Sequence, residues 1–306
     1  MKFPQINADK LVKRLQKPNK KIRMVLDTDT FNEIDDQFAI VYALQSKDKL
    51  DVEAIYAAPF DNELSTGPED GMEKSYDEIL RILDRLNISS KNFVFKGSRA
   101  FLTDVNQPYR TEAALDLVER AMKSDKDDPL YVVSIGAITN IASALLIEPS
   151  IIEKIVVVWL GGHAFHWPDT KEFNLRQDIL SSKVIFDSGV PLVQIPCMGV
   201  ASHLLTTLPE MEQYVSGHGK IGDFLVDRFK NCHNDHFGYS RVIWDISTIA
   251  YLVLDDAVTT ELVHSPILTD QYTWSFDSSR HFMRYASFIN RDAVFKDLFM
   301  KLALHK

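Results

Sequence analysis

Short runs of apolar, β-branched residues alternate along the chain with stretches in which apolar residues recur every three or four positions. The first pattern is typical of buried strands and the second of amphipathic helices. From residue 22 onward it predicts strands at 22–27, 52–58, 93–95, 130–135, 155–160 and 192–195. The helices predicted between them are 35–46, 72–86, 111–123, 138–146 and 177–186.

Strands that alternate with helices of this length form βαβ crossovers and a mainly parallel sheet covered on both faces. We therefore predict an α/β protein with a doubly wound sheet of Rossmann-like type. After residue 200 the pattern is mostly helical, at 221–229, 243–254 and 292–304, with strand-like runs at 261–268 and 271–276. No linker or repeat divides the chain, so residues 1–306 are predicted to form a single domain.

Composition narrows the classes of partner. The 306 residues contain 34 Lys and Arg against 43 Asp and Glu, a formal charge of −9, which argues against a nucleic acid partner. No apolar run approaches the ~18 residues that cross a bilayer, and the basic N-terminal stretch lacks the apolar segment of a secretion signal. We expect a cytoplasmic protein with no membrane partner. Its two cysteines, Cys197 and Cys232, cannot build a disulfide framework.

An acidic loop follows the first predicted strand, with Asp27, Asp29, Asp35 and Asp36 inside ten residues. Ligands of open parallel sheets bind at the carboxyl ends of the strands, where this loop lies. Carboxylates so close together repel one another unless a cation or dense hydrogen bonding compensates them. Oxygen ligands favour Ca²⁺ or Mg²⁺ over zinc. The loop therefore indicates a hard-cation site, although a solvated loop that caps the next helix is the simpler alternative.

The strand, Asp-x-Asp, short turn, Asp-Asp and apolar helix resemble the opening motif of the inosine-uridine-preferring nucleoside hydrolase family. Residues 134–142 resemble that family's Gly-x-Leu-Thr-Asn-Ile-Ala segment, and 159–162 with 172–174 resemble its Met-Gly-Gly…Glu-Phe-Asn segment. Trp244-Asp245 is similar to the helix start that carries the family's last metal-binding aspartate. The resemblance covers roughly residues 23 to 255 and implies the nucleoside hydrolase fold.

The resemblance implies a set of metal ligands and a catalytic base. Asp29, Asp36 and Asp245 would bind one Ca²⁺ together with the main-chain carbonyl of Ile135. Asp35 would be the general base that activates the attacking water, and Asp27 would support the loop by hydrogen bonding.

The implied activity is calcium-dependent hydrolysis of the N-glycosidic bond of ribonucleosides, which releases ribose and free base, as in nucleoside salvage. Glu172 and Asn174 would hold the ribose hydroxyls. An oxocarbenium-like transition state needs such anionic surroundings and a positioned water. The family resemblance also implies a homodimer or homotetramer.

Three segments depart from the family pattern, and the first is the turn between Asp29 and Asp35, which is two residues longer than the family's usual turn. Residues 58–62 replace a Gly-Asn pair, and Asp61 or Asn62 is the candidate to contact the sugar in its place. His163 and His166 stand where the family has small residues and a sugar-binding asparagine. We take His166 and His281 as candidate pocket residues, and as the first to test if a side chain protonates the leaving base.

Trp244 occupies the position at which one branch of the family has a histidine and a purine-preferring branch has tryptophan. An indole stacked on a purine favours the protonated ring, so purine nucleosides are the expected substrates. The alternative is that Trp244 packs the helix start into the core.

Two other functions stay open on the sequence. Residues 24–30 also fit the opening strand of a haloacid dehalogenase-type, Mg²⁺-dependent phosphohydrolase, with Asp27 as nucleophile. A non-catalytic, calcium-dependent ribose- or nucleoside-binding protein would retain the acidic loop without turnover.

Overall fold

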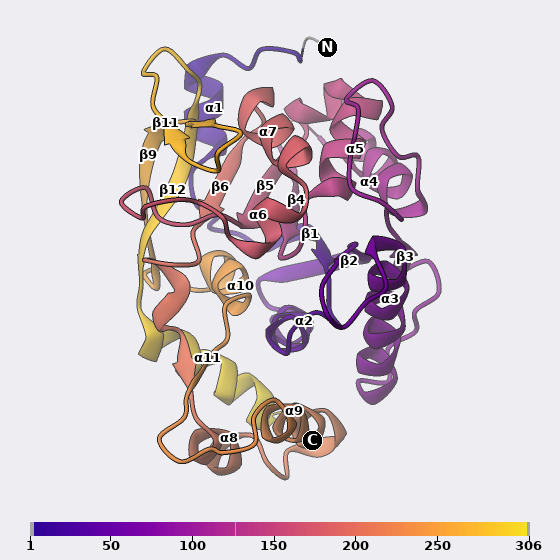
Figure 1. The fold of residues 1–306 in the computed structure, drawn as a ribbon, viewed down its shortest axis with the longest axis vertical. Helices are drawn as coiled ribbons and strands as arrows, with labels where there is room; N and C mark the ends of the chain where they lie inside the picture. Colours follow the sequence, from indigo (N-terminus) through magenta and orange to yellow (C-terminus); the bar gives the residue numbers. More distant parts are fainter. Residues whose placement is uncertain (1–2, 126, 305–306) are drawn as a thin grey trace.

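An eight-stranded sheet lies at the centre of the computed structural model, which describes residues 3–125 and 127–304 (Figure 1). The strand order is β3-β2-β1-β4-β5-β6-β12-β9. The strands are β1 (Ile22–Thr28), β2 (Leu50–Ala57), β3 (Val94–Lys96), β4 (Leu130–Ser134), β5 (Ile155–Leu160), β6 (Leu192–Ile195), β9 (Val258–His264) and β12 (Phe282–Ile289). Neighbouring strands are parallel except β9, which is antiparallel to β12.

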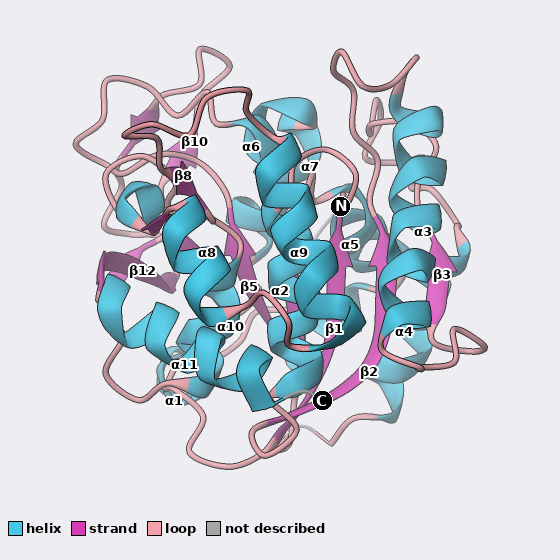
Figure 2. Cartoon of the chain, turned by 90° about the horizontal axis from the view of Figure 1, so that it is seen from below, coloured by secondary structure: helices cyan, strands magenta, loops and turns pink. Residues whose placement is uncertain are grey.

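The longer helices in the connections between the first six strands are α2 (Asp35–Gln45), α3 (Pro68–Arg85), α4 (Glu112–Lys123), α5 (Thr139–Ile147) and α7 (Ile179–Ser188). Short pairs of strands, β7 (Leu205–Thr206) with β8 (Arg241–Val242) and β10 (Ile267–Leu268) with β11 (Trp274–Ser275), lie outside the sheet. The other helices are α1 (Ala8–Arg14), α6 (Phe173–Gln177), α8 (Leu208–Tyr214), α9 (Gly219–Asn231), α10 (Ile246–Val253) and α11 (Arg291–Leu304). Figure 2 shows α8, α9 and α11 as a group on the near side of the sheet.

Side chains alternate between two apolar cores, one on each face of the sheet. Met24 and Leu26 of β1 enter the core that holds residues of α2, α10 and α11, while Val25 enters the core that holds residues of α4, α5 and α7. In β5, Val156 and Val158 enter the first of these cores, and Val157 and Trp159 enter the second. This period of two on a sheet buried on both faces explains the continuous apolar runs of the sequence. The predicted doubly wound α/β fold is confirmed.

The structure corrects several predicted elements. The helix predicted at 177–186 is two helices, because Asp178 ends α6 and caps α7 through its side chain. The strand-like run at 261–268 is divided between β9 and β10, and β12 lies between β6 and β9. The short helices α1 and α8 carry too few apolar positions for periodicity to reveal them.

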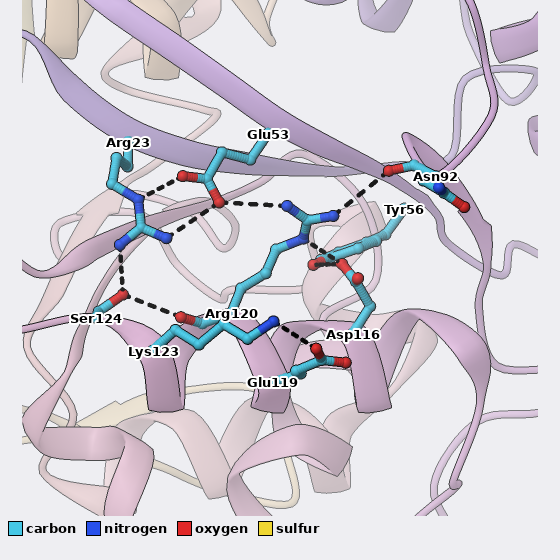
Figure 3. Close-up of polar contacts among 9 residues, drawn as sticks. All are labelled: Arg23, Glu53, Tyr56, Asn92, Asp116, Glu119, Arg120, Lys123 and Ser124. Carbon is cyan, nitrogen blue, oxygen red and sulfur yellow. Dashed lines mark hydrogen bonds and ion pairs between the residues drawn. The ribbon is translucent and has the colours of Figure 1, made fainter.

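A polar network fastens α4 to β1 and β2 near the amino ends of these strands (Figure 3). Glu53 of β2 accepts from both Arg23 of β1 and Arg120 of α4. Arg120 also pairs with Asp116 at 2.6 Å, and Asp116 accepts from the Tyr56 hydroxyl at 2.7 Å. Each ion finds an opposite charge, so the network holds a partly buried position at low cost. The carboxyl ends of the same strands remain free to form a site.

Among the helices of residues 3–125 and 127–304, none combines the length and the apolar character that a bilayer crossing requires.

Candidate active site

A cavity of about 290 Å³ opens at the carboxyl ends of β1, β4, β5 and β6. Because β1 and β4 are neighbours in the sheet but not in the chain, their carboxyl ends form the crevice where this sheet type binds ligands. The cavity is lined by Asp29, Asn32, Glu33, Asp35, Asp36, Ile135, Leu160, His163, Lys171, Glu172, Phe173, Asn174, Arg176, Cys197, Met198, Trp244 and Asp245.

Four buried aspartates converge in this cavity. Oxygen atoms of Asp35, Asp36 and Asp245 lie within 4.8 Å of one another. Asp29 lines the same cavity from the end of β1, and a Cβ atom at Gly136 would lie only 2.8 Å from its Oδ1. Only a glycine at position 136 therefore leaves room for Asp29 in this orientation.

Two helix starts bring these carboxylates together. Asp35 and Asp36 form the first turn of α2, where the amino-terminal end of a helix dipole favours negative charge. Asp245 directly precedes α10, and α10 packs against α2. The carboxylates thus approach because two crossing elements begin at the same edge of the sheet.

Several of these oxygen atoms have no hydrogen-bond donor in the structure. Both carboxylate oxygens of Asp29 and Oδ1 of Asp35 are buried and unpartnered. Burial, and then the charge of the neighbouring carboxylates, raises the pKa of Asp29 and Asp245, and burial raises that of Asp36 to about 7. Unpartnered buried oxygens among like charges are compensated either by protons or by a positive ion. The donor set is all oxygen and fits a divalent cation of the Ca²⁺ or Mg²⁺ type.

Asp27 lies behind the cavity rather than in its lining. It is fully buried, and its oxygens accept from Asn140 Nδ2 at 2.7 Å and Ser134 Oγ at 3.2 Å. Burial raises its pKa to about 7. Asn140 also accepts from the Ser98 backbone at 2.8 Å, so Asp27 ties β1 to the segments after β3 and β4. The position suits a supporting residue and leaves no access for a nucleophile.

Glu172 and Asn174 form the wall of the cavity that follows β5. The Glu172 carboxylate caps α6 by accepting from the backbone of Asn174 at 2.8 Å and of Leu175 at 3.0 Å. Asn174 Nδ2 donates to the carbonyls of Ile135 and Leu160, each at 3.1 Å. These contacts leave Asn174 Oδ1 available and hold the Ile135 carbonyl at the cavity.

Asp35 sits between a tryptophan and an ion pair. The backbone N–H of Trp244 donates to Asp35 Oδ2 at 3.1 Å, and the indole lines the cavity. Burial and the nearby Glu33 raise the pKa of Asp35, while Arg241 lowers it. Arg241 itself pairs with Glu33 at 3.3 Å. Asp35 is therefore a carboxylate held in place through one oxygen, with the other free.

Some residues that the sequence proposed do not reach the cavity lining. His166 is exposed, because the chain turns between Ala164 and Trp167 and directs it outward, whereas His163 lines the cavity instead. Asp61 is exposed with its backbone fixed by Gln177. Asn62 donates to Asn32 at 2.6 Å, so its contact with the cavity is indirect.

His281 is also absent from this cavity. It directly precedes β12, and because β12 is parallel to β6 it lies at the amino edge of the sheet, opposite the aspartates. It lines a separate cavity with residues 3–6 of the N-terminal segment. The expectation that it borders the pocket misjudged the direction of a strand whose place in the sheet the sequence did not reveal.

The cavity lining also includes residues that no sequence motif marks, among them Asn32, Lys171, Arg176 and Cys197. Only their closeness in sequence to motif residues could have indicated them, because none belongs to a recognisable spacing of ligands. A buried thiol such as Cys197, whose pKa burial raises, behaves like an apolar residue in a sequence pattern.

A doubly wound α/β sheet with a cluster of buried aspartates at its crevice defines the class of protein. A model of the family "Inosine-uridine preferring nucleoside hydrolase" matches residues 24–295. The chain belongs to this family.

Named relatives agree with that membership. The pyrimidine-specific ribonucleoside hydrolase RihB of Shigella flexneri is 27% identical over 162 residues, which cover 51% of this chain and 51% of that protein. The alignment thus spans about half the length of this curated relative. The solved purine-preferring ribonucleoside hydrolase from Gardnerella vaginalis has a TM-score of 0.73 at 22% identity, over 92% of this chain and 98% of that one. A solved inosine-guanosine nucleoside hydrolase has a TM-score of 0.74 at 14% identity, over 93% and 99%.

Family membership replaces the haloacid dehalogenase interpretation of the first strand. The buried position of Asp27 explains the replacement physically, since both its oxygens are engaged and it does not line the cavity.

The position of His281 predicts how stability depends on pH. Burial, and then Arg280, lowers its pKa to about 4, while Asp187 opposes the shift. The unfolded chain, with an ordinary pKa of about 6.5, binds the proton more readily. His281 therefore contributes stability above pH 6.5 that is lost as the pH falls toward 4, about 3 kcal/mol over the whole range. Urea unfolding of wild type and His281→Gln should give stabilities that converge in this range. The exposed-histidine variant His166→Gln should retain the wild-type slope, and an unchanged slope in His281→Gln would contradict the assignment.

Proposed function

We propose that this chain is a Ca²⁺-dependent hydrolase of the N-glycosidic bond of ribonucleosides, favouring purine nucleosides and acting as a homodimer or homotetramer. The observation that carries the proposal is the convergence of buried, unpartnered aspartate oxygens in a cavity at the crevice of the sheet. Family membership supports the reaction class. The proposed ligands of the cation are Asp29, Asp36, Asp245 and the Ile135 carbonyl.

The ribose would lie against the wall formed by Glu172 and Asn174. Asn174 Oδ1 is the free acceptor on this wall, since Nδ2 is engaged by two carbonyls. Glu172 holds this wall in shape by accepting three backbone N–H groups, the third from Gly162 at 2.9 Å. A rigid wall supplies oriented acceptors to the sugar hydroxyls without reorganisation during the reaction.

Asp35 is the proposed general base. One of its oxygens is fixed by the Trp244 backbone, and the other is buried without a donor. A cation held by the neighbouring aspartates would supply positive charge that orients a water and the ribose diol. Asp35 then takes the proton of the water that attacks the anomeric carbon. The surrounding carboxylates stabilise the positive charge that develops on the sugar.

Trp244 is the proposed partner of the leaving base. Trp244 lines the cavity and its backbone N–H donates to Asp35, so a base on the anomeric carbon near Asp35 would lie within reach of the indole. A neutral indole cannot deliver a proton, so the base must accept one from solvent, and purines have the more basic ring nitrogens. The relative RihB is named pyrimidine-specific, whereas the structural neighbour from Gardnerella vaginalis is named purine-preferring. Because these two proteins differ in the base that they are named for, the proposed purine preference is tested by comparing purine with pyrimidine nucleosides.

Incubation with a panel of ribonucleosides, followed by assay of the reducing sugar released, tests the proposed reaction. Inosine, adenosine and guanosine should release ribose faster than uridine and cytidine. Binding of nucleosides without any release of sugar would instead favour the non-catalytic ribose-binding protein.

The variant Asp35→Asn should abolish hydrolysis, lowering kcat by about 10²–10⁴. Asparagine keeps the volume and the contact with the Trp244 backbone but cannot accept the proton of water. Thermal unfolding should show that the variant folds. Residual kcat within a few-fold of wild type would remove Asp35 from the role of base.

Calcium should raise the unfolding temperature of chelator-treated protein, because a ligand that binds only the folded state adds stability with concentration. Without metal, Asp29→Asn should unfold at a higher temperature than wild type, because one repelling charge is gone. With calcium, its unfolding temperature should rise little, because one ligand is missing. Asp51→Asn, an exposed aspartate at the start of β2, is the matched control and should retain the full calcium response. A full response in Asp29→Asn would contradict its role as ligand.

Trp244→Ala should lower kcat/KM for inosine and spare a nitrophenyl riboside, whose leaving group needs no proton. An interaction of about 0.5–2 kcal/mol with the protonated purine corresponds to a loss of roughly 2- to 30-fold. Equal losses for both substrates would show that Trp244 acts only by packing.

A further inference from the structure

Two cationic side chains, Lys171 and Arg176, line the cavity alongside the carboxylates. Both residues are exposed, and they flank the wall that contains Glu172 and Asn174. Within residues 3–125 and 127–304, neither side chain forms an ion pair. Asp169 accepts from the backbone N–H of Lys171 at 2.9 Å and leaves the ammonium group unpaired.

These cations do not pair with the acidic floor of the cavity, which is the cluster of Asp29, Asp35, Asp36 and Asp245. Arg241 is the counter-ion of this floor, because it pairs with Glu33 and lowers the pKa of Asp35. The Arg176 guanidinium instead lies 5.3 Å from the centre of the Phe173 ring, which also lines the cavity. Two exposed positive charges that line one cavity, in a chain of net charge −9, are available to an anionic group of a ligand.

Their place in the fold indicates which part of a substrate they would meet. Asp35 and Trp244 belong to the side built from the β1 loop and the start of α10, whereas Lys171 and Arg176 belong to the segment after β5. In a ribonucleoside, the base and C5′ are carried by the two carbons that flank the ring oxygen. Lys171 and Arg176 are the exposed residues of the wall that holds Asn174. With the base against Trp244 and the hydroxyls at Asn174, a group on C5′ that extends along this wall toward solvent would meet these two cations.

We propose that the substrates of this site are ribonucleosides that carry a phosphate on the 5′-oxygen, held by Lys171 and Arg176. The inference rests on the proposed hydrolase function and specifies its substrate class. A phosphate monoester carries a charge of about −1.5 to −2 at pH 7. Arginine binds phosphate through two parallel hydrogen bonds, and lysine adds a compact charge on a flexible stem.

The reaction keeps the same balance of atoms. Water adds its hydroxyl to C1′ and gives its proton to Asp35, the C1′–N bond breaks, and the base leaves with a proton from solvent. The products are ribose 5-phosphate and the free base. The acidic floor repels a phosphate, so this group stays at the cationic mouth while the neutral diol enters. The charge pattern therefore orients the substrate before it reaches the base.

Hydrolysis of inosine 5′-monophosphate and inosine, measured as kcat/KM from the reducing sugar released, tests the inference. We expect the monophosphate to be the better substrate at low ionic strength and to lose this advantage as salt screens the charges. The ratio of the two kcat/KM values should fall at least tenfold in the double variant Lys171→Gln/Arg176→Gln. Lys47→Gln, an exposed lysine at the far end of α2, should leave the ratio unchanged.

A second measurement keeps the two proposals separate. Calorimetric titration of the Asp35→Asn protein, with and without the double substitution at Lys171 and Arg176, reports the binding of each compound without turnover. If inosine is hydrolysed but the phosphate gives no advantage, or the variant changes both substrates equally, the inference is wrong and the hydrolase function stands. If neither is hydrolysed, the hydrolase function fails, and tighter binding of the monophosphate that the double variant loses still supports the phosphate site. Equal binding of both compounds overturns it.

A separate experiment tests which part of the substrate the two cations contact. Nicotinic acid riboside and nicotinamide riboside differ by a negative charge on the base rather than on the 5′-oxygen. The proposed location is wrong, and the cations face the base, if two results are found together. Nicotinic acid riboside has a higher kcat/KM than nicotinamide riboside only in the protein with both cations, and the 5′-phosphate does not raise kcat/KM.

Discussion

The mutual repulsion of buried aspartates governs the organisation of this molecule. Asp29, Asp35, Asp36 and Asp245 are each no more than 3% exposed, and three of their oxygens have no donor. A folded protein tolerates such a cluster only if its carboxylates take up protons or a cation joins them. The raised pKa values of these carboxylates correspond to the uptake of protons, and their all-oxygen donor set corresponds to the binding of a cation. The rest of the sheet serves to keep the carboxylates together against this repulsion.

That support comes from opposite ends of the strands. At the amino ends, the network of Arg23, Glu53 and Arg120 pairs every charge and fixes α4 to β1 and β2. At the carboxyl ends, Asp27 is held by neutral donors from β4 and α5, and its own pKa is raised to about 7. One end of the sheet satisfies its charges within the protein, and the other leaves them for a ligand. This division separates stability from function along the strand axis.

The fold was predictable because its signals are local. Continuous apolar runs in β1, β4 and β5 identify strands buried on both faces, and ten-residue amphipathic stretches identify the crossovers. The place of β12 between β6 and β9 was not predictable, because pairing across 90 residues leaves no periodic trace in the chain. His281 was misassigned for this reason alone. Its residue type suggested chemistry, but the strand direction sends it to the opposite edge of the sheet.

The same distinction applies to the candidate site. Residues within motifs, such as Asp29, Asp36, Glu172 and Asn174, were placed together by resemblance, and the structure brings each of them to the cavity. His166 was predicted to reach the pocket, although His163 does, because the sequence of a loop does not show which of its side chains a turn directs inward.

The charge pattern of the cavity connects the metal site to the choice of substrate. An acidic floor alone would attract any cation and repel every phosphorylated sugar, so it selects for neutral hydroxyls. Lys171 and Arg176 at the mouth change that preference, because they add attraction for an anion at a distance from the floor. Under the proposed function, Trp244 adds a third requirement, a flat ring that can accept a proton without help from a side chain. A molecule that meets all three conditions has a neutral diol in its middle, an anion at one end and a basic aromatic ring at the other. The 5′-phosphorylated purine ribonucleosides have this arrangement, and the site's distinct walls follow from the order in which the sheet presents its strand ends.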